Sequence, residues 1–291
     1  MAESTFALRK IRSISANLSD TVEFLRLHFK PLVGSFFALS GVFILLQIVL
    51  TDLVAAKLQP AAAGLQHFEA IAPYLRYMSV PLAFFGLVAW LAYIAMQTAV
   101  AAYMKYCDTH EGDSPAVDDV WRIFIRYYPR LVLYSVPLAL MVLLGTLFCV
   151  LPGIFLAVVW VPFPFVVIME EASLGEGISR CYALIRRNFW TTLGIYGITL
   201  LIYIAASVML GLTGGMITGL WSLVTKTDAL IVRRLVTAVA KLASVLFYLL
   251  FLVSAALHYF SFAEQEDATG IIRRVEKMGR PADQHDSPPP S

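Results

Sequence analysis

Long apolar runs alternate with short polar stretches along this chain. Six of these runs approach the roughly 20 apolar residues that a helix needs to cross the hydrocarbon core of a bilayer. The predicted spans cover residues 32–55, 78–104, 131–150, 153–169, 191–212 and 235–262. The pattern therefore predicts an all-α integral membrane protein with six transmembrane helices.

A short amphipathic stretch precedes the first, third and fifth spans. In each stretch apolar residues recur at helical spacing, and basic residues occupy other positions. The apolar sets are Leu18, Val22, Leu25 and Phe29; Val117, Val120, Phe124 and Tyr128; and Leu174, Ile178, Cys181 and Ile185. A helix of this kind lies in the membrane interface. The sequence thus predicts three repeated units, each made of one cytoplasmic interfacial helix followed by a hairpin of two spans.

Lys and Arg residues are divided unevenly between the two sides that this topology defines. Sixteen of the 22 lie on the side that carries both chain ends, and six lie on or near the other side. Because short cytoplasmic loops are enriched in Lys and Arg, we assign the richer side to the cytoplasm. Arg233 and Arg234 oppose this bias, which leaves the outer loop at 213–234 the hardest segment to place.

The composition is that of a membrane protein. Hydrophobic residues make up 59% of the chain and charged residues 14%, against roughly 25% charged residues in a soluble domain. The net charge of +2 gives no electrostatic reason to expect a nucleic-acid partner. The three cysteines lack CxxC spacing, which argues against a disulfide framework or a zinc site.

The chain divides into three predicted parts. Residues 1–13 form an N-terminal cytoplasmic tail, and residues 14–278 form the six-helix membrane domain. Residues 279–291 are rich in proline and polar side chains, so we expect this tail to be disordered.

Two motifs resemble those of a known family. The first is Leu151-Pro152-Gly153-Ile154-Phe155-Leu156-Ala157, and the second runs from Glu171 to Cys181 and is followed by Arg187-Asn188-Phe189-Trp190. Together they resemble the membrane domain of some glycerophosphoryl diester phosphodiesterases and related stand-alone bacterial six-helix proteins. The resemblance implies a multi-pass protein of the bacterial inner membrane. It does not imply phosphodiester hydrolysis, because in that family the chemistry resides in a separate soluble domain for which this sequence has no room.

A few polar or helix-breaking residues within the spans are candidates for an intramembrane site. Lys241 lies six residues inside the last span, where it either snorkels to the membrane surface or faces the bundle interior. His258 is a weaker candidate for proton transfer, because no acidic residue accompanies it on its helix. Pro162 and Pro164 must kink or break the fourth span. Broken helices can line binding sites in transporters, although a packing kink is the simpler interpretation.

The cytoplasmic side carries two further candidates. Glu170 and Glu171 have the chemistry for a metal site or for acid–base work, but helix capping is their simpler role. The basic residues of the amphipathic stretches either attract anionic lipid or a partner, or only enforce topology. Those candidate contacts are Arg122, Arg126, Arg180, Arg186 and Arg187.

Three functions are compatible with these observations. We favour a non-enzymatic subunit or scaffold in envelope or lipid homeostasis, because the sequence contains no P-loop, GxSxG or HExxH motif. A small transporter or channel-like protein is the first alternative, and it rests on the repeat, the prolines and Lys241. An intramembrane enzyme is the second, and it rests on Glu170, Glu171 and His258. The expected partners are the bilayer, anionic lipids and a membrane or cytoplasmic protein, with no cofactor and no metal.

Overall fold

The computed structural model describes residues 6–64, 71–110, 115–186, 188–225 and 230–267. Within these ranges the regular structure is helical: α1 (Ile14–Gly64), α2 (Ile71–Thr109), α3 (Val117–Phe148), α4 (Val150–Trp160), α5 (Phe163–Met169), α6 (Leu174–Arg186), α7 (Phe189–Thr225) and α8 (Leu230–Asp267). Six stretches are long and apolar enough to cross a membrane: Ile14–Thr51, Ser79–Thr109, Val117–Phe148, Val150–Met169, Phe189–Thr225 and Ile231–Asp267. The prediction of an all-α chain with six such helices is confirmed.

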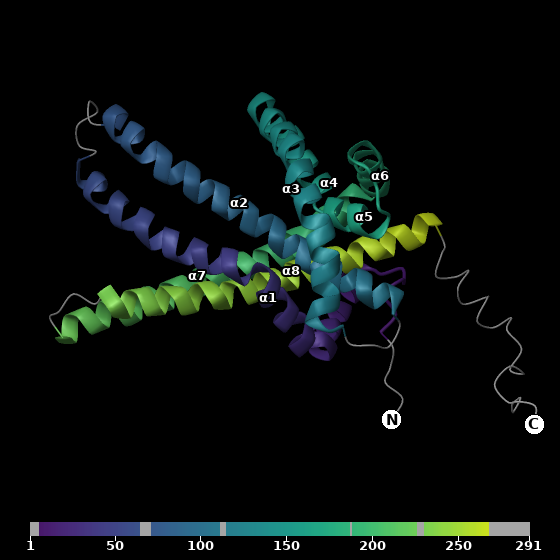
Figure 1. The fold of residues 1–291 in the computed structure, drawn as a ribbon, viewed down its shortest axis with the longest axis horizontal. Helices are drawn as coiled ribbons and strands as arrows, with labels where there is room; N and C mark the ends of the chain where they lie inside the picture. The colour runs from purple at the N-terminus through teal and green to yellow at the C-terminus, as the bar shows by residue number, and fades with distance from the viewer. Residues whose placement is uncertain (1–5, 65–70, 111–114, 187, 226–229, 268–291) are drawn as a thin grey trace, which may run out of the picture.

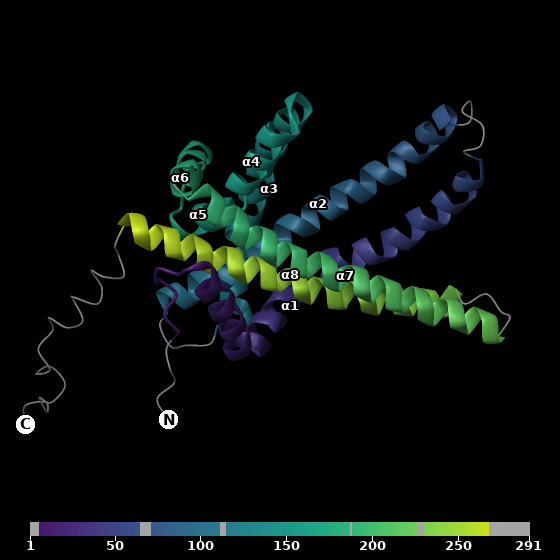
Figure 2. The same ribbon diagram turned by 180° about the vertical axis from the view of Figure 1, so that it is seen from behind.

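The long helices converge at one end of the molecule and diverge toward the other (Figure 1). From the convergence, α1 runs beside α2, α3 beside α4, and α7 beside α8, as the view from behind also shows (Figure 2). We call the convergent end the hub and define it as residues 6–40, 92–108, 115–138, 158–186, 188–196 and 249–267. Both the beginning of α1 and the end of α8 lie in the hub.

The buried core lies in the hub. Every residue of α5 from Phe163 to Ile168 is buried, and so is the stretch of α2 from Ile94 to Met104. Apolar side chains on the diverging parts are exposed instead, as Phe148 shows with an exposure of 88%. Apolar surface of this extent needs a hydrocarbon environment, which agrees with helices that cross a membrane.

The amphipathic stretches predicted before the first and third spans join their spans in different ways. The first is set off by a kink at His28, where two helices meet within α1 and the backbone angles are non-helical, whereas α3 continues through Pro129 without such a break. Pro31 accounts for the kink in α1, because its ring crowds the carbonyl of the residue four positions earlier and it lacks an N–H donor. The stretch before the fifth span does form its own helix, α6. Apolar periodicity is the same in both arrangements, so the pattern does not show where one helix ends.

The turn between α3 and α4 lies at Cys149, earlier than the predicted turn at Leu151–Gly153. Cys149 alone has extended backbone, with φ −165° and ψ 142°. Pro152 falls in the first turn of α4, where the missing N–H costs no intrahelical bond. Gly153 faces α3 so closely that a Cβ there would lie 2.1 Å from the Oγ1 atom of Thr146.

The segment predicted as an outer loop at 213–234 is largely helical. α7 continues to Thr225 and α8 begins at Leu230. The two helices also contact each other at this end, because a Cβ on Gly214 would lie 3.0 Å from the Cγ1 atom of Val236. The two predicted spans have 22 and 28 residues, whereas α7 has 37 residues and α8 has 38. Contact between the two helices accounts for the added length.

Candidate functional site

Lys105, near the end of α2, links three other parts of the hub. Its Nζ atom donates hydrogen bonds to the Oη atom of Tyr127 on α3 at 3.1 Å and to the carbonyl oxygen of Ile168 on α5 at 2.7 Å. It also pairs with the Oε1 atom of Glu171 at 2.9 Å. Tyr127 donates to the same carboxylate oxygen at 2.9 Å. One ammonium group therefore holds α2, α3, α5 and the turn after α5 together.

Glu171 lies in a turn whose backbone is unusual for a side chain of its kind. Its φ angle is 54°, in the left-handed region that residues other than glycine rarely adopt. Hydrogen bonds from Lys105 and then Tyr127 lower the pKa of this carboxyl group below its ordinary value. The strained turn thus carries an ionised side chain, and its contacts offset the backbone cost.

Glu170, the neighbouring carboxylate, has a different set of partners. The Nε atom of Arg180 on α6 lies 3.1 Å from both of its carboxylate oxygens, and Tyr259 on α8 donates to Oε1 at 2.9 Å. Arg180 also pairs with Asp267 near the end of α8. Burial acts to lower the pKa of Arg180, but the charge of Glu170 and the two carboxylate hydrogen bonds outweigh it and raise this pKa.

The two adjacent glutamates therefore belong to two separate ion pairs. In the part of the chain that the structure describes, no group of three or more His, Cys, Asp or Glu side chains is placed to hold a metal ion. Both carboxylates of the Glu170–Glu171 pair, which the sequence offers for metal binding or acid–base chemistry, take part in contacts between helices.

The segment before α1 is also tied into the hub. Arg9 forms two hydrogen bonds with Asp108 of α2, from Nε to Oδ1 at 2.9 Å and from Nη2 to Oδ2 at 2.7 Å. The Arg12 side chain is only 1% exposed and pairs with Asp20 at 2.8 Å. The backbone N–H of Arg12 donates to the Oγ atom of Ser261 on α8 at 2.9 Å. Residues from position 6 onward therefore pack against the membrane helices.

His258 lies in a packed part of the hub. Its Nε2 atom lies 3.1 Å from the Oγ1 atom of Thr192 on α7, and the rings of Tyr196 and Phe262 contact the imidazole. The side chain is 2% exposed. These contacts place a hydroxyl and two aromatic rings around the candidate proton-transfer residue.

Pro162 and Pro164 interrupt the fourth span as predicted. α4 ends at Trp160, and α5 begins at Phe163, with Pro162 as its N-cap residue. Both prolines are buried, and the backbone N–H of Val166 donates to the carbonyl oxygen of Pro162 at 3.0 Å. The break turns the chain into the hub core, where α5 packs among other helices.

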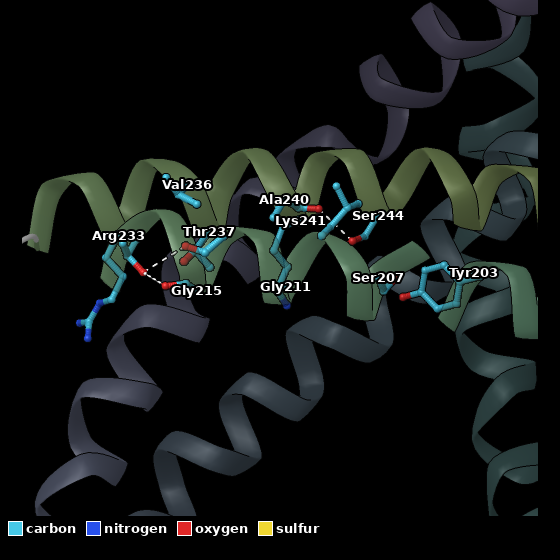
Figure 3. A pocket seen from close by; sticks show the side chains of 13 residues that line it. Tyr203, Ser207, Gly211, Gly215, Arg233, Val236, Thr237, Ala240, Lys241 and Ser244 are labelled. Atoms are coloured by element: carbon cyan, nitrogen blue, oxygen red, sulfur yellow. Dashed lines mark hydrogen bonds between the residues drawn. The ribbon is translucent and has the colours of Figure 1, made fainter. Parts of the chain in front are cut away.

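Lys241 lies apart from the other candidates, in a hollow between α7 and α8 (Figure 3). The hollow has a volume of about 490 Å³, and Arg233 also lines it. Lys241 and His258 are on the same helix, but they are separated by roughly 25 Å at 1.5 Å per residue. The structure therefore does not gather Lys241, His258, Pro162 and Pro164 into one intramembrane site.

The basic residues predicted to contact lipid or a partner differ in their availability. Arg122 and Arg126 on α3 and Arg186 at the end of α6 are exposed. Across the described ranges, these three form no ion pair. Arg180 is already paired, and Arg187 lies outside the described residues.

Sequence reasoning missed the roles of Lys105, Arg9 and Arg12, which it treated only as cations that set topology. Each of them has an acidic partner in the hub. The signal that could have revealed these pairs was the set of acidic residues predicted on the same side of the membrane as the three cations. A carboxylate near a membrane helix needs a cation or hydrogen-bond donors as partners. Which pairs form depends on how the helices pack.

Comparisons with protein-family models, curated proteins and solved structures found no match to this chain.

Proposed function

We propose that this chain is a non-enzymatic subunit or scaffold of the bacterial inner membrane, with both termini in the cytoplasm. The observation that carries the proposal is the pairing within the hub, where charged side chains bind one another across α2, α6, α8 and the segment before α1. Polar groups used in this way hold helices in place and fix a single arrangement. The outer ends of the helices then present apolar surface to lipid.

The hub surface supplies the binding function of such a scaffold. Arg26 and Lys30 on α1 are exposed, as are Arg122 and Arg126 on α3 and Arg186 on α6. In the proposed arrangement, three repeated units place these residues at the cytoplasmic headgroup level. Each cation near an anionic membrane surface contributes about 1 kcal/mol of attraction. The expected ligands are anionic lipids or an acidic protein segment.

Lipid co-purification tests this proposal. A variant with Arg122→Gln, Arg126→Gln and Arg186→Gln should retain several-fold less phosphatidylglycerol and cardiolipin than the unmodified chain, measured by lipid mass spectrometry after purification. A matched variant with Lys at the same three positions keeps the charge and should retain lipid. Correct insertion of both variants is checked by protease accessibility. Unchanged lipid content in the Gln variant would reduce these residues to a role in topology.

A small transporter or channel-like protein is the second candidate. One observation favours it, namely the cationic hollow around Lys241 in an otherwise apolar helix pair. The break at Pro162 does not line this hollow but packs among buried side chains.

The resemblance to the membrane domain of glycerophosphoryl diester phosphodiesterases stays a prediction. Under our proposal, the purified chain has no hydrolase activity toward glycerophosphodiesters. Turnover that disappears in a Glu170→Gln, Glu171→Gln variant would contradict the non-enzymatic function.

A further inference from the structure

The hollow between α7 and α8 is lined by residues from 203–218 and 233–244, beyond the parts of these two helices that belong to the hub (Figure 3). On α7 its wall contains Gly211, Gly214 and Gly215; a Cβ on Gly214 would meet Val236 of α8 at 3.0 Å, whereas Gly211 and Gly215 border open space. On α8 its wall contains Arg233 and Lys241. The result is a groove with cations on one helix and open backbone on the other.

The two cations of this groove have no negative partner in the described part of the chain. Neither Lys241 nor Arg233 forms an ion pair there, and the residues that line the groove include no acidic side chain. They are spaced by about 12 Å along α8 at 1.5 Å per residue. A cation within a membrane helix is costly unless it reaches water or meets an anion, so the groove favours an anionic ligand.

Hydroxyl groups complete the polar side of the groove. The Oγ atom of Ser207 is buried and has no hydrogen-bond partner among the described residues, although it lines the hollow. Ser244 and Thr218 instead donate to carbonyl oxygens of their own helices. A buried hydroxyl without a partner has an unused donor, and an ammonium group with a hydroxyl donor suits the oxygens of a phosphate.

Apolar side chains complete the wall of the groove. Leu210 on α7 and Val236 and Ala240 on α8 line it, and both helices are long and apolar enough to cross a membrane. A free phosphate ion would make no favourable contact with this apolar surface, whereas the acyl chains of a lipid would cover it. We propose that the groove binds an anionic phospholipid, with its phosphate beside Lys241 and Ser207, with Arg233 as a second cation farther along the groove, and with its acyl chains along α7 and α8.

Photo-cross-linking in lipid nanodiscs tests the site directly. The full chain is reconstituted with a trace of phosphatidylglycerol or phosphatidylcholine that carries a diazirine on an acyl chain, and cross-linked peptides are mapped by mass spectrometry. Peptides from 203–218 and 233–244 should be labelled more by phosphatidylglycerol than by phosphatidylcholine. Lys241→Gln should lower this preference about fivefold, the factor that the attraction of one cation supplies.

Two matched variants separate specific binding from general charge and folding effects. Arg234→Gln removes an exposed cation that does not line the groove, so it should leave the preference unchanged. Lys241→Arg keeps the charge and should retain the preference. Equal labelling by the two lipids in the unmodified chain, or equal losses in Lys241→Gln and Arg234→Gln, would overturn the proposal.

A competition experiment distinguishes a lipid from a soluble phosphate. Glycerol 1-phosphate carries the same phosphate chemistry without acyl chains, and it should not displace the cross-linked phosphatidylglycerol at millimolar concentration. Displacement would assign the groove to a soluble phosphate ester and overturn the lipid. Labelling of peptides from α3 and α6 in the same samples reports separately on the hub surface, so failure of one proposal does not count as failure of the other.

Discussion

The contacts of the single residue Lys105 stabilise the hub. Its ammonium group satisfies the carbonyl of Ile168 and holds Glu171 and Tyr127. We expect Lys105→Met to lower the free energy of unfolding by about 1–3 kcal/mol, because the carbonyl loses a charged donor in a partly buried site. Thermal unfolding in detergent, followed by intrinsic fluorescence, measures the change. Lys10→Met is the matched control, since Lys10 is 55% exposed and lies 4.0 Å from Asp20. An equal loss in both variants would contradict the role of Lys105.

Glu171 makes the same contact dependent on pH. Its folded-state pKa is lowered, so its contribution to stability is complete above the ordinary glutamate pKa of about 4.3. The contribution is lost as the pH falls through the folded-state pKa. The difference in unfolding temperature between the unmodified chain and Glu171→Gln should therefore be present at pH 7 and shrink at pH 3. A difference that stays constant across this range would exclude the ionised carboxylate as its source.

Single residues also show where sequence reasoning stops. The sequence assigns Lys105 and Arg9 to the predicted cytoplasmic side, because that assignment depends only on their position along the chain. Their partners Glu171 and Asp108 are 66 and 99 residues away, and such contacts depend on helix packing. The break at Pro162 was predictable, since its cause lies within the residue itself.

Gly153 controls the contact between α3 and α4 at the scale of the elements. A Cβ added there would meet the Oγ1 and Cα atoms of Thr146 at 2.1 and 2.8 Å. Gly153→Ala should therefore push the two helices apart and destabilise the protein by about 1–3 kcal/mol. Gly41→Ala in α1 is the control, because a Cβ there meets nothing within 4 Å. Unfolding temperatures of the two variants in the same detergent would decide the matter, and equal values would contradict close packing at Gly153.

The elements themselves were predicted with uneven success, and the reason is physical. The start of α6 has a local signal, in which Glu176 accepts hydrogen bonds from the backbone N–H and the Oγ of Ser173 as in a capping box. Pro31 is the local signal for the kink in α1, whereas Pro129 does not interrupt α3 between its first part and the span that follows. α7 continues beyond residue 212 and α8 begins before residue 235, and these extensions depend on contact between the two helices. Hydropathy along the sequence does not reveal contacts between helices.

At the scale of the whole molecule, the proposed topology makes a direct prediction. Reporter fusions after Ser291 and before Met1 should both give the cytoplasmic signal, because the richer set of cations lies on that side. Alkaline phosphatase and green fluorescent protein report opposite sides of a bacterial inner membrane. A fusion at position 228, between α7 and α8, should give the periplasmic signal. Phosphatase activity from either terminal fusion would reject the orientation.

The contact between the first and last helices has a consequence for biosynthesis. Asn17 of α1 is buried, and its partner is Ser254 of α8, whose Oγ donates to the Asn17 Oδ1 at 2.7 Å across 237 residues of chain. Since the ribosome makes α1 before α8, the Asn17 amide has no Ser254 partner until the 237 residues that lead to Ser254 have been synthesised. A chain arrested before α8 leaves Asn17 and the Arg12 backbone without these bonds. Quality-control proteases that extract incomplete membrane proteins would therefore find the first turns of α1 in contact with α2 but not yet with α8 until translation has passed the final span.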